Sequence, residues 1–259
     1  MNEGERMRRN SAIYIIMKFL IFSICLFFMN MYANQLLTPK NHVEALQTQD
    51  SKVVSDLESE LVRLNQNQGV NKSIYIYSTH QQEKYTDSGV YEGSQYLAEK
   101  LRAMGYEVIL EESDFEHYAA SKGLDYDDLY QVSNTFLTEA LVNHGGFDLI
   151  IDFHRDSVGA NATQLLANNK SYARLMFVIG GLSEKVESVR ASSQALSSIV
   201  DSYLPEISRG TFEREAYYNQ YVTDHMLLIE VGGVENSFTD VKNSLDILAL
   251  SIHDYLENS

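Results

Sequence analysis

From Ser73 onward, short apolar runs with the length of β-strands alternate with longer stretches that have the pattern of α-helices. Strands that alternate with helices in this way usually form a mostly parallel sheet with helices on its faces. The sequence therefore predicts an α/β fold, a three-layer sandwich around a mostly parallel central sheet. The expected strands are Ser73–Tyr77, Glu107–Leu110, Asp148–Phe153, Leu175–Ile179 and Met226–Val231. The expected helices are Ser94–Met104, Asp125–Asn143, Lys185–Tyr203 and Val241–Leu256.

Polar motifs follow three of these apolar runs. In an open α/β sheet the carboxyl ends of the parallel strands form one edge, and ligands bind in the crevice there. We therefore expect the three motifs to bring histidines and carboxylates together at one place. They are Ser78-Thr79-His80-Gln81-Gln82-Glu83, Asp152-Phe153-His154-Arg155-Asp156 and Glu230-Val231-Gly232-Gly233-Val234-Glu235-Asn236.

His80, Glu83 and His154 are residue types that bind zinc. His-x-x-Glu in a tight turn or at a helix start places both side chains on one side. Each motif alone also has an ordinary structural explanation, such as a histidine hydrogen-bonded by Asp152 or Asp156. Either of these acids would also suit the partner that orients a zinc-bound histidine. Because three such motifs meet at one edge, we predict a zinc ion bound by two histidines and one glutamate, with a fourth position open for water.

Glu230 and Arg155 are the predicted catalytic residues. Glu230 ends an apolar run and precedes a Gly-Gly pair, so partial burial would raise its pKa towards neutrality, as suits a general base. Zinc lowers the pKa of a bound water, whose proton Glu230 would take. The metal and a cation such as Arg155 would stabilise the tetrahedral oxyanion. This chemistry is amide hydrolysis.

The N-terminal part of the chain differs from the rest. Residues 12–32 are almost wholly apolar and follow Arg6, Arg8 and Arg9. This pattern predicts a transmembrane anchor with a cytoplasmic tail within residues 1–33, or alternatively a cleaved signal peptide. Residues 34–70 have the apolar stripe of a helical spacer, and 71–259 are the expected catalytic domain. Either alternative for the first segment places that domain outside the cytoplasm.

Charge and cysteine content exclude several classes of protein. The net charge of −16 argues against nucleic-acid binding, which needs a basic face. The one cysteine, Cys25, lies in the apolar N-terminal segment. The expected catalytic domain therefore has neither a disulfide nor a cysteine nucleophile.

The motifs resemble those of the stage II sporulation protein P family. They have the pattern Thr-His-x-x-Glu-x-Tyr at 79–85, Asp-x-His-Arg-Asp at 152–156 and Ile-Glu-Val-Gly-Gly-Val-Glu-Asn at 229–236. Tyr218-Asn219-Gln220 precedes the last motif, which is the longest and most specific. The resemblance covers residues 73–256.

The resemblance implies a membrane-anchored peptidoglycan hydrolase with a fold similar to that of zinc-dependent cell-wall amidases. Its substrate would be the amide between N-acetylmuramic acid and the L-alanine of the stem peptide, and it would also cut peptide cross-links. The family further implies a role in sporulation, in engulfment of the forespore, with a lytic transglycosylase as partner. In the related amidases the acidic zinc ligand lies at the start of the next helix, where Glu92 stands here. Glu83 and Glu92 therefore remain alternatives for that ligand.

Two other functions are compatible with the same residues. A zinc carboxypeptidase acting on cell-wall peptides would use a similar ligand set, together with a cation for the terminal carboxylate. A catalytically inactive domain that binds peptidoglycan or scaffolds an envelope complex would bind no metal.

Overall fold

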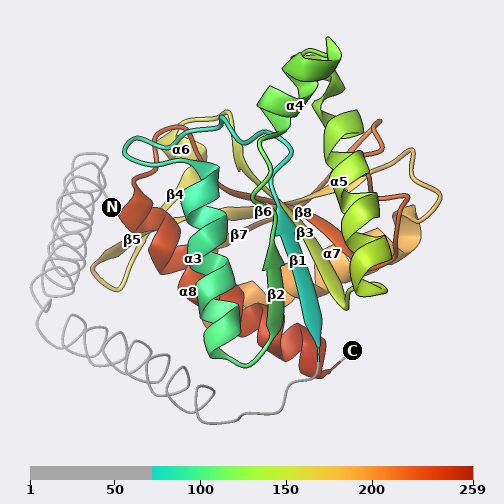
Figure 1. The fold of residues 1–259 in the computed structure, drawn as a ribbon. Coiled ribbons are helices and arrows are strands. Elements are labelled where there is room, and N and C mark those ends of the chain that lie inside the picture. Colours follow the sequence, from blue (N-terminus) through green and yellow to red (C-terminus); the bar gives the residue numbers. More distant parts are fainter. Residues whose placement is uncertain (1–71, 259) are drawn as a thin grey trace, which may run out of the picture. The chain divides into compact units, whose positions relative to one another are not determined.

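The computed structural model describes residues 72–258, in which a sheet lies between layers of helices (Figure 1). The predicted anchor or signal peptide and the predicted spacer lie outside these residues. Among residues 72–258, none of the helices combines the length and the apolar character needed to cross a bilayer.

A six-stranded sheet in the order β2-β1-β3-β8-β6-β7 forms the centre of the fold. The strands β2, β1, β3 and β8 run parallel, whereas β6 is antiparallel to β8 and β7 runs parallel to β6. The prediction of a mostly parallel sheet is therefore confirmed, with β6 and β7 reversed at one side. The strand bounds are β1 Ser73–Tyr77, β2 Glu107–Leu110, β3 Leu149–Asp156, β6 Leu175–Gly180, β7 Ser208–Arg214 and β8 Met226–Gly233.

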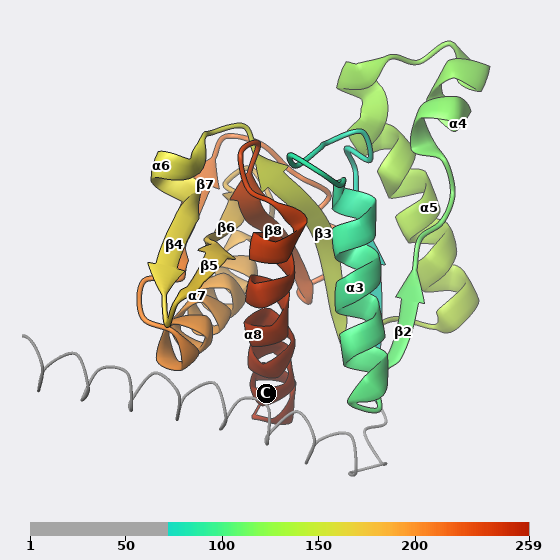
Figure 2. The same cartoon turned by 90° about the vertical axis from the view of Figure 1, so that its left-hand side faces the viewer.

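Helices cover both faces of this sheet, which gives the predicted three layers (Figure 2). On one face lie α3 (Val90–Ala103), α7 (Val186–Tyr203) and α8 (Phe238–Glu257). On the other lie α4 (Phe115–Lys122) and α5 (Leu129–His144), joined through the 3-10 turn Tyr126–Asp128. A short helix α6 (Ala160–Thr163) leads into a hairpin of β4 (Gln164–Ala167) and β5 (Lys170–Ala173), which packs beside α8.

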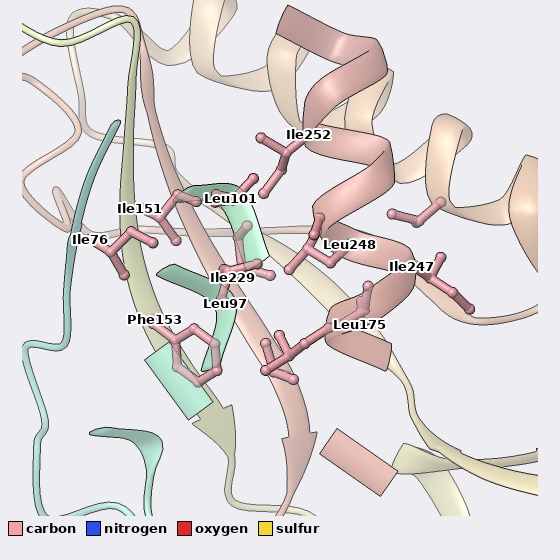
Figure 3. Packing of buried hydrophobic residues seen from close by; sticks show 14 of the residues in the cluster. Ile76, Leu97, Leu101, Ile151, Phe153, Leu175, Ile229, Ile247, Leu248 and Ile252 are labelled. Carbon is pink, nitrogen blue, oxygen red and sulfur yellow. The ribbon is translucent and has the colours of Figure 1, made fainter. Parts of the chain in front are cut away.

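The larger core lies between the sheet and α3, α7 and α8 (Figure 3). Ile151 and Phe153 of β3 and Ile229 of β8 face these helices, since alternate side chains of a strand point to the same side. Full burial of one such side chain contributes roughly 1.5–3 kcal/mol. Gly93 lets α3 pack directly on β3, because a Cβ at this position would lie only 2.8 Å from the ring carbon Cζ of Phe153.

The opposite face of the sheet has a smaller core beneath α4 and α5. The connection between β7 and β8 reaches the same side, where Asn219 donates a hydrogen bond to Ser133 of α5. Gln220 in the same connection donates to the backbone carbonyl of Val178 in β6. The buried side chains of this core include Tyr75, Tyr77, Ile150 and Met226 from the sheet and Phe115, Leu129, Val132 and Leu137 from the helices.

Residues 72–258 contain five elements beyond those predicted from the sequence, namely α4, α6, β7 and the two hairpin strands β4 and β5. The helix α4 depends on its ends more than on an apolar stripe: Asp114 accepts a hydrogen bond from the N–H of His117, and Gly123 ends the helix with a φ of 72°. The strand β7 is at the edge of the sheet with several exposed side chains, so it has no continuous apolar run. The helix α3 begins at Val90, four positions before the predicted Ser94.

Candidate active site

His80 lies in the turn after β1, and this turn is attached to β3. The N–H of Thr79 donates to Asp152 Oδ1 at 2.9 Å, and Thr79 Oγ1 donates to Asp152 Oδ2 at 2.8 Å. The ring of His80 stacks on Tyr126 with centroids 4.6 Å apart and meets the edge of Tyr130 at 5.4 Å. Burial, together with the charge of His154, lowers the pKa of His80. His80 is therefore held as a neutral imidazole, the form that binds metal ions.

His154 lies on β3 and is almost fully buried, with 3% of its surface exposed. Its Nδ1 is 3.6 Å from Glu83 Oε2, and its Nε2 is 2.9 Å from Asp152 Oδ1. Burial alone would lower the pKa of His154, but the carboxylates of Asp152 and Glu83 raise it well above its usual value. The ring centroid of His154 is 5.4 Å from that of His80, so the first two motifs meet as predicted.

Glu83 and Glu92 occupy different environments, which bears on the predicted alternative between them. Glu83 Oε2 accepts a hydrogen bond from the N–H of Arg155 at 3.0 Å, directly beside His154. Glu92 Oε2 instead accepts from the N–H of Gly89 and caps the start of α3. The structure therefore brings Glu83 to His154, whereas the carboxylate of Glu92 is engaged at a helix end.

Glu230 is the direct neighbour of His154 across the parallel strand pair β3–β8. Paired residues of neighbouring strands point to the same face, so both side chains lie on the α5 side of the sheet. Burial raises the pKa of Glu230 to about 7; the charge of His154 opposes this rise, and the carboxylates of Glu83 and Asp156 add to it. A carboxylate with a pKa near neutrality is suited to accept and return a proton.

Arg155 does not extend towards these groups. Its Nε donates to the backbone carbonyl of Lys84 at 2.8 Å, and its Nη1 lies 3.3 Å from the carbonyl of Asp156. The register between β3 and β8 shifts between His154 and Asp156, which changes the direction of the side chain between them. In this structure the guanidinium holds the segment after Glu83, and its role at an oxyanion stays a prediction.

Several residues around the site had no specific signal in the sequence. Tyr126 and Tyr130 enclose His80, although nothing in their spacing distinguishes them from other tyrosines of the chain. Ser133 Oγ lies 3.0 Å from Thr79 Oγ1 and accepts a hydrogen bond from Asn219 Nδ2 at 2.9 Å. These contacts join α5 and the β7–β8 connection to the turn that carries His80.

Two buried polar atoms at the site have no hydrogen-bond partner: His80 Nδ1 and Glu230 Oε2. Such atoms are rare and often mark a place where an ion or water binds. Imidazole nitrogen and carboxylate oxygen are the donors that zinc prefers, so the residue types fit the metal. Within residues 72–258, no three His, Cys, Asp or Glu side chains converge as they stand on a point that would hold a metal ion. A bound ion would therefore require these side chains to turn towards one another.

The fold is shared with a bacterial amidase. The structure of the CwlD amidase from Clostridioides difficile in complex with the GerS lipoprotein superimposes with a TM-score of 0.50 at 15% sequence identity, over 73% of this chain and 100% of that chain. An N-acetylmuramoyl-L-alanine amidase from Clostridium difficile 630 gives a TM-score of 0.45 at 13% identity, over 73% of this chain and 98% of that chain. The first of these similarities defines the chain as an α/β protein of the CwlD amidase fold.

The family is defined by sequence. The family model described as stage II sporulation protein P (SpoIIP) matches residues 29–253, and the chain therefore belongs to the SpoIIP family. The stage II sporulation protein P of Bacillus subtilis (strain 168) is 29% identical over 204 residues, which is 71% of this chain and 51% of that protein. The chain thus spans about half the length of the curated relative it matches. The resemblance seen in the three motifs is confirmed.

Proposed function

We propose that this chain is a zinc-dependent peptidoglycan hydrolase that cleaves the amide between N-acetylmuramic acid and L-alanine during sporulation. The observation that carries the proposal is the meeting of His80, Glu83, His154 and Glu230 on one side of the sheet, with two of their buried atoms, His80 Nδ1 and Glu230 Oε2, lacking hydrogen-bond partners. Membership of the SpoIIP family and the fold of the CwlD amidase support this substrate class and reaction.

The proposed ligands of the zinc ion are His80, Glu83 and His154. A zinc ion bound by them would polarise the amide carbonyl and make a bound water more acidic. Glu230 then takes a proton from the attacking water and passes it to the nitrogen of the leaving L-alanine. A pKa of about 7 suits both transfers, because the carboxylate is ionised often enough to accept a proton and acidic enough to return it.

Asp152 prepares the site without touching the substrate in this proposal. Its carboxylate is fully buried and binds the backbone and hydroxyl of Thr79, which fixes the turn that carries His80. The same carboxylate lies 2.9 Å from His154 Nε2. It therefore restrains both histidines at once, as carboxylates behind metal-bound histidines commonly do.

We also propose that the catalytic domain acts outside the cytoplasm and is attached to the membrane through residues 1–33. The supporting observation is the apolar stretch at 12–32 that follows three arginines. A lytic transglycosylase is the proposed partner, because it would open the glycan that the amidase strips of peptides. This partner rests on the family alone.

Zinc content and product release test the proposal together. The purified protein should contain about one zinc per chain and release stem peptides from peptidoglycan, measured by elemental analysis and mass spectrometry. His154→Ala should lose both properties. The matched control is His225→Ala, because His225 is exposed and immediately precedes β8, at the opposite end of that strand from Glu230. Absence of metal and of product after purification with added zinc would overturn the proposal and favour a binding domain.

A further inference from the structure

The connection between β7 and β8 presents three tyrosines beside the site. Tyr217 and Tyr221 are exposed by 54% and 44%, and their rings meet edge to face with centroids 6.0 Å apart. The ring of Tyr218 is 5.4 Å from that of Tyr130, which itself stacks on His154 at 6.4 Å. The rings of Tyr130 and Tyr218 thus lead away from His154, and the same connection carries the exposed pair Tyr217 and Tyr221.

The backbone of this connection is strained. Tyr218 and Asn219 have φ angles of 49° and 58°, the left-handed region that non-glycine residues rarely adopt. Two such residues in succession cost of order 1–3 kcal/mol each, and strain of this kind concentrates at functional sites. Other contacts must therefore stabilise this conformation, and the strain suggests that the conformation serves a function.

The support comes from two buried amide side chains. Asn219 donates to Ser133 Oγ and to the carbonyl of Tyr130, while Gln220 accepts from the N–H of Gly180 and donates to the carbonyl of Val178. The absence of a Cβ at Gly180 allows this fit, because a Cβ there would lie 2.7 Å from the carbonyl oxygen of Tyr217. The connection is thereby attached to α5 on one side and to β6 on the other, and its tyrosines are held in place before any ligand arrives.

We propose that Tyr217, Tyr218 and Tyr221 bind the glycan strand of the substrate, by stacking on the apolar faces of its N-acetylated sugar rings. The inference rests on the proposed function, since the glycan is the part of peptidoglycan attached to the scissile amide. Tyrosine suits this task because it offers a large, rigid, amphipathic surface with a polar tip. The three side chains are themselves uncharged within a chain of net charge −16, which favours a neutral sugar over a polyanion.

The charge and position of the surface distinguish the glycan from the stem peptide. Tyr130 stacks on His154 and Tyr218 packs against Tyr130, so a polymer bound by the β7–β8 connection would lie close to the reacting bond. None of the three tyrosines carries a charge that would pair with the carboxylates or amines of a stem peptide. A stem peptide as the occupant is the alternative that the experiment must separate.

The test measures binding without catalysis. The full-length protein carrying Glu230→Gln is titrated calorimetrically with a tetramer of β-1,4-linked N-acetylglucosamine and, separately, with a free stem peptide. Tyr217→Ala with Tyr221→Ala should weaken binding of the tetramer by about tenfold, the effect of losing two aromatic contacts. The same positions changed to Phe should keep the affinity, because stacking needs the ring and not the hydroxyl. Tyr91→Ala, which removes an exposed tyrosine of α3, is the matched control.

Two results would overturn the inference: tetramer binding that the double alanine variant leaves unchanged, or a loss of affinity confined to the free stem peptide. Failure of the proposed function would look different, because the protein with Glu230 intact would then bind the tetramer without releasing stem peptides from peptidoglycan. Normal kinetics of stem-peptide release by the double alanine variant with Glu230 intact, combined with unchanged tetramer binding, would overturn only the proposal of a glycan surface.

Discussion

The two faces of the strands β3 and β8 carry opposite chemistry. On the face towards α3, α7 and α8, Phe153 and Ile229 are fully buried among apolar side chains. On the face towards α5, the adjacent positions hold Asp152, His154 and Glu230. Neighbouring residues of the same strand thus belong to the apolar core and to the candidate site in turn, because side chains of a strand alternate between faces.

This difference between the two faces shows how the fold tolerates the buried polar groups of the candidate site. Apolar side chains on the first face gain free energy by leaving water and require no specific partner. On the second face, Glu230 Oε2 is buried without a hydrogen bond. A buried polar atom without a partner costs about 1–3 kcal/mol. The burial of apolar side chains on the first face therefore offsets the free energy that is lost by burying polar groups on the second.

The largest effect is expected at Glu230. Glu230→Gln should lower kcat for stem-peptide release by about 10²–10⁴-fold, the usual contribution of a general base. Zinc content should stay the same, because Glu230 is not among the proposed ligands. Steady-state kinetics and elemental analysis measure the two properties. Loss of zinc in this variant would instead identify Glu230 as a ligand.

On the apolar face, Phe153→Ala should lower the free energy of unfolding by about 3–5 kcal/mol, because it leaves a cavity against α3. Urea denaturation at 25 °C measures the change. Val142→Ala is the control, since Val142 is 77% exposed on α5 and should change stability by no more than about 0.5 kcal/mol. A change of similar size in both variants would contradict the description of this core.

The pH dependence of stability sharpens the comparison. Burial raises the pKa of Glu230 from 4.5 to about 7, so the unfolded chain releases this proton first as pH rises. The folded protein therefore loses stability between these two values, by about 3 kcal/mol at most. Glu230→Gln removes this loss.

The variant should accordingly be more stable than the parent at pH 8 and equally stable at pH 4. Denaturation in the presence of a chelator, which keeps bound metal from contributing, measures both. Equal stability of the two proteins at pH 8 would show that Glu230 ionises without cost, and that the site is more open to water than its burial indicates.

A smaller effect is expected at Asp152. Asp152→Asn removes the negative charge beside His154 and should lower kcat by about 10–100-fold, as is typical for the partners of metal-bound histidines. The pKa of His154 should also fall, because the carboxylate of Asp152 helps to raise it. NMR titration of the chelated protein follows the ring directly. An unchanged pKa together with reduced activity would assign Asp152 a purely structural role through Thr79.

Local patterns predicted much of the fold. The apolar runs at β1, β3, β6 and β8 identified those strands, and periodic apolar positions identified α3, α5, α7 and α8 within a few residues. These elements have strong signals because each buries a continuous stripe or run. The helix α4 and the edge strand β7 bury less of their surface, and their formation depends on caps and on neighbouring strands.

The site shows the same division between local and distant causes. The sequence by itself determined that His80, Glu83, His154 and Glu230 follow or end strands, and that this chemistry would gather at one edge of a parallel sheet. Only the tertiary structure decided that Glu83 rather than Glu92 lies beside His154, and that Arg155 contacts the carbonyl of Lys84. Strand register, a shift in pairing and helix capping decide where each of these side chains points, and all three depend on residues far apart in the chain.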